Sequence, residues 1–392
     1  MDAPPANRPP SIAHQASLES IPTPALVLDT TRLDRNLNRL SERMSALGVV
    51  LRPHLKTAKS AEVARRVYPA EPGPITVSTL AEAEYFAEHG FRDITYAVGL
   101  APDKAARALR LSAAGVDLKV LLDSPVQARA LAAAGRALGI KPAALIEIDC
   151  DGHRGGLVPD DPTLPEVANA LATAGVSLAG ILAHAGESYG MNSPEALEAA
   201  ADSERAAAIA AARILRRLGH ECPIVSVGST PTAHFSRNLE GVSEVRAGVY
   251  MFFDLIMHGA GVCNLDDIAL SVLATVIGHK PEKGWILVDA GWMALSGDRG
   301  TAAQAVDQRY GLVCDLAGRP YPDLIVAEAS QEHGILAVRS GSGRSLPSLP
   351  IGTRVRILPN HACATAAQHD AYNVVCGTST VIEANWPRLR GW

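Results

Sequence analysis

The 392-residue chain is 47% hydrophobic and 20% charged, which supplies enough apolar surface for a substantial core and for two domains. Its net charge of -5 and its scattered acidic and basic residues exclude a protein that binds nucleic acid or a strongly anionic membrane through a basic surface. No apolar run is long enough to span a bilayer. The composition therefore favours a globular protein with no nucleic-acid or membrane partner.

The first 22 residues are predicted to be a flexible N-terminal segment. Their beginning, MDAPPANRPPSIAHQ, is polar and rich in proline, and it lacks the basic start and apolar stretch of a signal peptide. The six cysteines of the chain are far apart and do not form the framework of a small disulfide-bonded domain. Reduced thiols and a cytoplasmic location are therefore expected.

Residues 23–255 are predicted to form a (β/α)8 barrel. Short runs rich in Val, Ile and Leu alternate with Ala-rich helical stretches that begin at cap residues and end at glycine. This alternation is typical of parallel strands joined by crossover helices, and eight runs favour a closed barrel over an open sheet. The predicted strands are 49–53, 75–78, 94–98, 118–122, 144–149, 178–183, 224–228 and 243–247.

Residues 256–392 are predicted to form a second domain, which is mostly antiparallel β. Segments such as IALSVLATVIGH, GWILVDAG, HGILAVRS and GTRVRILP have strand composition, and turn-prone stretches separate them. The complete prediction is an α/β protein made of a barrel and a C-terminal β-rich domain.

A lysine stands just beyond the first predicted barrel strand, in VVLRPHLKTAKS. Functional groups of barrels lie at the carboxyl ends of the strands. There Lys56 can be partly desolvated, which lowers its pKa and frees the amine to form a Schiff base. The alternative is a solvated loop lysine like its neighbour Lys59.

Glycines and polar side chains follow the later strands. They include Arg154 after strand five, His184 and Tyr189 after strand six, Gly228, Ser229 and Thr230 after strand seven, and Gly248 and Tyr250 after strand eight. The loops after strands seven and eight commonly bind phosphate in barrels. A lysine and a phosphate-binding loop at one barrel mouth together indicate pyridoxal 5'-phosphate (PLP), although each loop alone could be an ordinary turn.

His361 and Cys363 form a second candidate site, in LPNHACATAAQHD. Alternating residues of an extended segment point the same way, and an imidazole with a thiolate suits zinc. Two ligands are half of a tetrahedral site, as in catalytic centres that leave positions for water or substrate. The alternative is a buried free cysteine near a hydrogen-bonded histidine.

Six motifs occur in the order RPHLKTAKS, DGHRGG, SVGSTPT, EVRAGVYMFFD, QEHGIL and PNHACAT. With these motifs the chain resembles the D-serine dehydratase / D-threonine aldolase family, whose members are fold-type III PLP enzymes with an alanine-racemase-like barrel. The resemblance extends over residues 23–392. It implies a homodimer with the active sites at the interface.

The resemblance also implies roles for individual residues. Lys56 would form the Schiff base with PLP, and Arg154 would face the phenolic oxygen of the cofactor. His184 or Tyr189 would line the cofactor ring, and the phosphate would lie against the glycine-rich loops. Those loops contribute Gly228, Ser229, Thr230, Gly248 and Tyr250. His361 and Cys363 would hold a divalent metal, with zinc preferred over manganese or cobalt.

The implied reaction is the dehydration of a D-3-hydroxy amino acid. Lys56 would remove the α-hydrogen as general base, while the metal would polarise the β-C–O bond. 3-Hydroxyaspartate would yield oxaloacetate and ammonia, and D-serine would yield pyruvate. Aldolases of the family usually carry an aspartate where Cys363 stands, so this cysteine favours a dehydratase.

Three alternatives stay open. An aldolase would need a base for the β-hydroxyl proton, and Glu332 and His333 could supply one or could form an exposed turn. An amino-acid racemase would need a second base on the opposite face of the cofactor. A non-catalytic PLP-binding protein would have no use for the His361–Cys363 pair.

Overall fold

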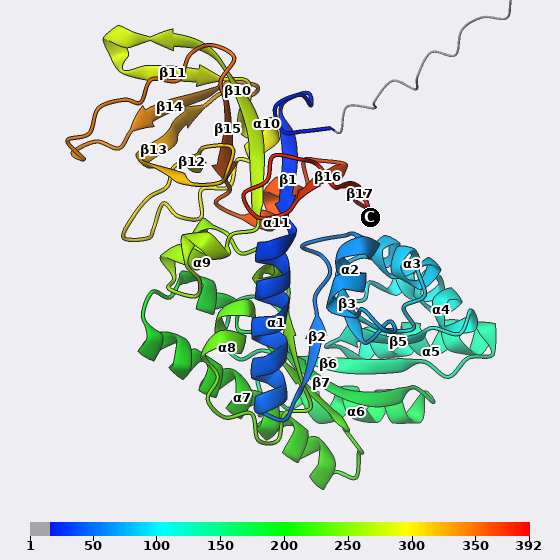
Figure 1. Cartoon of the computed structure of the whole chain (residues 1–392). Coiled ribbons are helices and arrows are strands. Elements are labelled where there is room, and N and C mark those ends of the chain that lie inside the picture. Colours follow the sequence, from blue (N-terminus) through cyan, green and yellow to red (C-terminus); the bar gives the residue numbers. More distant parts are fainter. Residues whose placement is uncertain (1–15) are drawn as a thin grey trace, which may run out of the picture.

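The computed structural model describes residues 16–392 as a β/α barrel with a β domain at one end (Figure 1). The barrel sheet has eight parallel strands in the order β2-β9-β8-β7-β6-β5-β4-β3. A parallel bridge between His54 and Thr76 links the two outer strands. The strands are β2 (Val50–Pro53), β3 (Ile75–Val77), β4 (Asp93–Gly99), β5 (Asp117–Leu122), β6 (Ala143–Ile148), β7 (Ser177–Ala183), β8 (Ile224–Val227) and β9 (Glu244–Ala247). All eight predicted strands are confirmed, because strands buried on both faces are recognisable as continuous apolar runs.

Helices surround the barrel and connect its strands. They are α1 (Thr30–Ala46), α2 (Ala61–Val67), α3 (Leu80–Glu88), α4 (Ala105–Ala113), α5 (Pro125–Leu138), α6 (Thr163–Thr173), α7 (Pro194–Arg217) and α8 (Thr230–Phe235). Several begin at a cap residue that the sequence makes visible. Ser124, for example, accepts a hydrogen bond from the Gln127 amide at the start of α5, which ends at Gly139 in a left-handed conformation.

The second domain is built on a nine-stranded sheet in the order β11-β14-β13-β12-β15-β10-β1-β16-β17. Its strands are β1 (Ala25–Asp29), β10 (Leu270–Lys280), β11 (Trp285–Val288), β12 (Leu312–Cys314), β13 (Pro320–Ala329), β14 (Gly334–Val338), β15 (Arg354–Leu358), β16 (Ala371–Val375) and β17 (Ala384–Pro387). Because β10 also pairs with β11, the strands from β10 to β15 form a closed ring. All pairs are antiparallel except β1 with β16.

Strand β1 lies in this second sheet and not in the barrel. It pairs with β10 and β16, and α1 then carries the chain from Asp29 down to the barrel (Figure 1). The predicted barrel range of 23–255 therefore included one strand that the structure places in the other domain. The apolar sequence of β1 shows that it is a buried strand, but it does not show which distant strands it pairs with.

The predicted flexible segment, residues 1–22, is only partly visible, because residues 1–15 lie outside the described chain. The remainder packs on the β domain. Leu18 is fully buried, its amide donates to the Thr380 carbonyl at 2.8 Å, and Ser17 forms a bridge with Val381. For residues 16–22 the prediction of a flexible segment is therefore wrong, since one buried leucine and its backbone bonds fix them.

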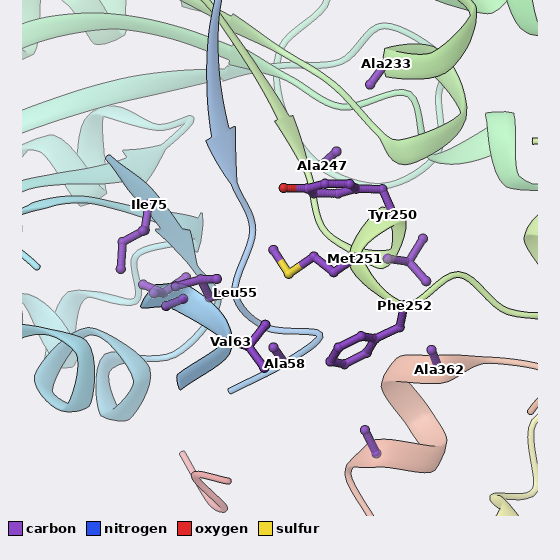
Figure 2. Packing of buried hydrophobic residues seen from close by; sticks show 14 of the residues in the cluster. Leu55, Ala58, Val63, Ile75, Ala233, Ala247, Tyr250, Met251, Phe252 and Ala362 are labelled. Atoms are coloured by element: carbon purple, nitrogen blue, oxygen red, sulfur yellow. The ribbon is translucent and has the colours of Figure 1, made fainter. Parts of the chain in front are cut away.

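The cores of both domains meet where the barrel ends (Figure 2). Leu55 and Ala58 follow β2, Phe252 follows β9, and Ala362 begins α11 (Ala362–Ala366) of the β domain. All four belong to one buried apolar cluster. All six cysteines are free, and no helix within residues 16–392 is both long and apolar enough to cross a membrane.

Candidate active site

A cavity of about 370 Å³ lies at the carboxyl ends of the barrel strands, where the β domain covers the barrel. Its volume is in the range of small-molecule sites, roughly 300–1,000 Å³. It brings together nine of the predicted residues: Lys56, Arg154, His184, Tyr189, Gly228, Ser229, Gly248, His361 and Cys363. The two candidate sites, which are about 300 positions apart in the chain, therefore share one cavity.

Lys56 projects from the loop that links β2 to α2. Its side chain is accessible through the cavity, but protein surrounds it, and this burial lowers the pKa of its amine. Nearby His54 is half-buried, and its pKa falls well below the usual value because of desolvation and the positive charge of Lys56. A neutral imidazole and a readily deprotonated amine thus stand side by side.

His184 and Tyr189 line the opposite part of the cavity, with ring centroids 6.2 Å apart. His184 Nδ1 lies 2.8 Å from the Gly228 carbonyl, which can only accept, so Nδ1 carries the proton. Burial lowers the pKa of His184 to about 3, so its Nε2 stays unprotonated. Tyr189 binds the backbone through its hydroxyl oxygen, 3.4 Å from the Thr230 amide.

Arg154 reaches the cavity from the loop after β6. It is half-exposed, and its guanidinium lies 3.9 Å from Glu147 Oε1. Neighbouring His153 is held by Glu187, with 2.8 Å between Nδ1 and Oε1. Arg154 is thus a cation at the cavity wall that remains available to an anionic ligand.

The glycines after β8 and β9 lie where a side chain would collide with neighbouring parts of the chain. A Cβ on Gly228 would lie 2.2 Å from the Arg246 carbonyl, and one on Gly248 would lie 2.9 Å from the His54 carbonyl. Gly228 also has a φ of +131°, which side chains rarely permit. Glycine at both positions therefore lets these loops pack closely against neighbouring backbone, and both glycines line the cavity.

Thr230 and Tyr250 support this cradle without lining the cavity. The Tyr250 amide donates to Thr230 Oγ1 at 3.3 Å, which joins the loops after β8 and β9. Tyr250 is buried, and its hydroxyl has no partner within the described residues. Figure 2 shows its ring lying at the end of β9. Thr230 and Tyr250 were predicted to contact the phosphate, but neither residue lines the cavity.

Glu204 of α7 is a functional residue that sequence reasoning missed. Its Oε1 accepts from the Ala185 amide at 2.9 Å and the Gly228 amide at 2.8 Å, and its Oε2 accepts from the Thr232 hydroxyl at 2.8 Å. One buried carboxylate therefore fixes the ends of β7 and β8. Nothing in the pattern of α7 distinguishes this glutamate from the exposed ones except its place on the apolar face.

Replacing Glu204 tests this anchor. Glu204→Ala leaves three buried donors unpaired and is expected to lower the free energy of unfolding by roughly 3 kcal/mol or more. Glu204→Gln should cost much less, because the amide oxygen still accepts two N–H groups and the Thr232 hydroxyl can reorient. Denaturant unfolding of the two variants measures the difference; equal losses would contradict this role.

His361 and Cys363 stand at the start of α11, beside the barrel cavity. Only His361 has extended backbone, since Cys363 is already in the first helical turn, so the prediction of an alternating extended pair is wrong in its geometry. Burial raises the pKa of Cys363, but His361 and the contact with Thr57 outweigh it and lower the pKa below its usual value. A thiolate, the form that binds metals, is favoured here.

Asp298 orients this histidine and was also missed. Its Oδ2 lies 2.7 Å from His361 Nδ1, so Nε2 is the ring nitrogen left for a metal. Within residues 16–392 no group of three or more His, Cys, Asp or Glu side chains is arranged to hold a metal. A metal would therefore have two protein ligands and open positions.

Asp298→Asn is expected to weaken metal affinity by roughly 10- to 100-fold, because the carboxylate that raises the basicity of His361 becomes a neutral amide. Competition against a metal-binding dye measures the affinity. Asp160→Asn, at an exposed position, is the control. Unchanged affinity in Asp298→Asn would show that His361 does not depend on this partner.

Asp254 fastens the segment that carries His361 and Cys363 to the barrel. Its Oδ1 accepts from the Met257 amide and its Oδ2 from the Ala362 amide, each at 2.9 Å. Met257 lies in the short helix α9 (Leu255–Gly259) and Ala362 in α11. The carboxylate therefore links the chain leaving the barrel to the helix that carries Cys363.

Glu332 and His333 are not part of the cavity. They lie on the exposed turn between β13 and β14, where the Ser330 amide donates to the His333 carbonyl at 2.8 Å. Their predicted role as catalytic bases is not supported by this placement, since the hairpin directs them to the surface of the chain. Both residues lie in an exposed turn, which was the alternative prediction for them.

Comparisons with known proteins agree with this architecture. Residues 28–255 match the family model "Alanine racemase, N-terminal domain", and residues 269–375 match "Putative serine dehydratase domain". The chain is 52% identical to D-threo-3-hydroxyaspartate dehydratase from Delftia sp. strain HT23, over 96% of this chain and 100% of that protein. It is 30% identical to D-serine dehydratase from Dictyostelium discoideum, over 94% and 97% of the two chains.

Solved structures show the same similarity. The structure of the Delftia dehydratase matches with a TM-score of 0.93 at 52% identity, covering 96% of this chain and 100% of that chain. A cysteine-to-alanine mutant of that enzyme was solved in the metal-free form. D-threonine aldolase from Filomicrobium marinum matches with a TM-score of 0.81 at 27% identity, covering 96% of this chain and 97% of that chain.

Proposed function

The chain belongs to the D-serine dehydratase / D-threonine aldolase family with an alanine-racemase-like barrel, and on this basis we propose that it is a PLP- and metal-dependent dehydratase. The proposed substrate is D-threo-3-hydroxyaspartate, which would give oxaloacetate and ammonia, with D-serine as a second substrate. The observation that carries the proposal is the single cavity shared by Lys56, the glycine cradle and the His361–Cys363 pair. The 52% identity to a dehydratase of this substrate supports it.

The residues of the cavity fit both groups. Lys56 would hold PLP, the backbone at Gly228 and Gly248 would receive its phosphate, and His361 with Cys363 would hold the metal, for which zinc is proposed. The position of both glycines in one cavity with Lys56, and the lowered pKa of the Cys363 thiol, support this fit. When bound, PLP acidifies the α-hydrogen of the amino acid attached to it, and a divalent metal weakens the bond to a β-hydroxyl.

The protein contributes proton transfer and orientation. The lowered pKa of Lys56 keeps its amine able to accept the proton from Cα, and its position after β2 restricts it to one face of the ligand. His184 stays neutral beside the ring site, and Arg154 offers a positive charge at the wall. Loss of the α-hydrogen and the β-hydroxyl leaves an enamine, which water hydrolyses to the 2-oxo acid and ammonia.

The D configuration of the substrate and a homodimeric state are proposed from the family relationship. An aldolase is the competing proposal, because aldolases belong to the same family. Cys363 and the remote position of Glu332 and His333 favour elimination over cleavage of the C–C bond.

Product analysis tests the proposal. Purified PLP-loaded protein would be incubated with D-threo-3-hydroxyaspartate or D-serine, with and without EDTA. Oxaloacetate or pyruvate with ammonia, suppressed by EDTA, is expected. Glyoxylate and glycine from the hydroxyaspartate would mean that the C–C bond breaks and that the enzyme is an aldolase.

A further inference from the structure

The last residues of the chain hold the loop that carries Lys56, and we propose that Arg388 is a positioning residue for this lysine. The inference rests on the proposed function, in which Lys56 is the cofactor lysine. It concerns a segment, residues 388–391, that lies outside the cavity and follows the last strand.

The loop between β2 and α2 cannot satisfy its own backbone. It contains only one turn-type bond, from the Lys59 amide to the Leu55 carbonyl, and Lys59 adopts a left-handed φ of +47°. The carbonyls of Thr57, Ala58 and Lys59 accept no hydrogen bond from within this loop and need donors from elsewhere. Those donors come from the other end of the chain.

Arg388 supplies the first donors. Its Nε lies 3.0 Å from the Ala58 carbonyl and 2.9 Å from the Tyr372 hydroxyl, and its Nη2 lies 3.5 Å from the Thr57 carbonyl. The Tyr372 hydroxyl donates to the same Ala58 carbonyl at 2.7 Å. Arginine and tyrosine therefore converge on two carbonyls directly after Lys56.

Arg388 and Tyr372 are both buried, so their contact with the loop lies in the protein interior. Arg388 is 8% exposed and Tyr372 is fully buried, and the guanidinium lies 5.9 Å from the tyrosine ring centroid. In the described part of the chain Arg388 forms no ion pair with a carboxylate. A buried guanidinium is costly, so its hydrogen bonds to the loop are what stabilise it there.

The residues after Arg388 make further contacts with the same loop. The Leu389 amide donates to the Lys59 carbonyl at 2.8 Å, and Lys59 Nζ lies 3.5 Å from the Gly391 carbonyl. Lys59 Nζ also pairs with buried Glu82 at 3.2 Å. Lys59 is thus fixed to the barrel by its side chain and to the tail by its backbone.

On its other side the loop is fixed to the two domains. The Leu55 amide donates to the Thr76 carbonyl at 2.9 Å, and Thr57 Oγ1 lies 3.2 Å from Cys363 Sγ. Figure 2 shows Leu55 and Ala58 of this loop within the buried cluster that also holds Ala362 of α11. Lys56 therefore sits between anchored neighbours, and its side chain is the part left free to enter the cavity. Arg388 adds to the support of the loop from outside the cavity.

Arg388→Met tests the inference because it keeps the apolar stem and removes the donors. In the PLP-free protein, hydrogen exchange of the Lys59 amide is expected to accelerate by about 10-fold to 100-fold, since the loss of buried charged hydrogen bonds favours local opening. In the loaded protein, kcat should fall by about 10-fold with little change in KM, and the pH midpoint of the bound cofactor absorbance should shift. Arg388→Lys should restore part of each effect.

Arg390→Met is the matched control. Arg390 lies two residues away on the same tail but is exposed and pairs only with exposed Asp370, so wild-type behaviour is expected. If Arg388→Met does not fold, deletion of residues 389–392 removes the Leu389 donor and should also accelerate exchange at Lys59. Wild-type exchange and wild-type kcat in Arg388→Met, or in the deletion if only that folds, would overturn the inference. If the wild-type protein does not bind PLP at Lys56, the proposed function is wrong. The hydrogen-exchange experiment on the PLP-free protein would still show whether Arg388 stabilises the loop.

Discussion

The Lys56→Ala protein is expected to lose turnover by at least about 10³-fold and to lose the covalently held cofactor. The lysine is both the attachment point and the general base of the proposed reaction, and a positioned base alone contributes roughly 10²- to 10⁴-fold. Turnover is followed as ammonia release. Attachment is measured by borohydride reduction with PLP and mass spectrometry of the peptide that contains residue 56.

Lys104→Ala is the control for this prediction, because Lys104 is exposed at the end of the short 3-10 helix Pro102–Lys104 and does not line the cavity. It should retain full turnover and full labelling of Lys56. Covalent labelling that persists in Lys56→Ala would identify another lysine as the attachment point. Lys59 would then be the first candidate, since it lies on the same loop.

The Cys363→Ala and His361→Ala proteins are expected to keep the absorbance of the bound cofactor but to lose dehydration by about 10³-fold or more. Each removes one of the two proposed protein ligands, and polarisation of a leaving group by a metal is worth several kcal/mol. Metal content by mass spectrometry and product formation are measured on the same samples. In the wild-type protein, EDTA should produce the same loss, and adding back zinc, manganese or cobalt ranks the metals.

Cys376→Ala is the matched cysteine control, because that thiol is exposed and lies outside the cavity. Its activity and metal content should equal those of the wild-type protein. Full activity of Cys363→Ala in the presence of a chelator would refute the metal-assisted mechanism. The proposed lyase would then have to expel hydroxide with an acid from the protein.

The sequence was sufficient for the barrel because its signals are local. Runs such as 118–122 and 178–183 are mostly apolar, and the helices between them are bounded by caps and glycines. In the β domain strands β12 and β13 were missed. Leu312–Cys314 is only three residues long and gives no period, and Pro320–Ala329 has two prolines near its start, which weaken its strand signal. The place of β1 was missed because pairing with β10 and β16 depends on contacts far apart in the chain.

In the candidate site, too, some residues could be predicted from the sequence and others could not. Lys56 and the glycine loops could be predicted because they follow strands, and strand ends meet at one barrel mouth. Glu204 and Asp298 could not be predicted, because each acts through a hydrogen bond to a group distant in the sequence. The sequence around an acidic residue does not show which distant group it will bind. Glu332 and His333 were selected from the QEHGIL motif for their acid–base side chains, and both are exposed in the turn between β13 and β14.

The position of β1 has a consequence for how the chain acquires its structure. This strand is synthesised before the barrel, yet both of its neighbours, β10 and β16, are synthesised after the barrel. The central sheet of the β domain therefore cannot close until nearly the whole polypeptide has left the ribosome. Meanwhile α1 can already pack on the finished barrel and hold β1 in place beside it. A fragment beginning after the barrel would lack this strand and would leave β10 and β16 with unpaired edges that favour aggregation.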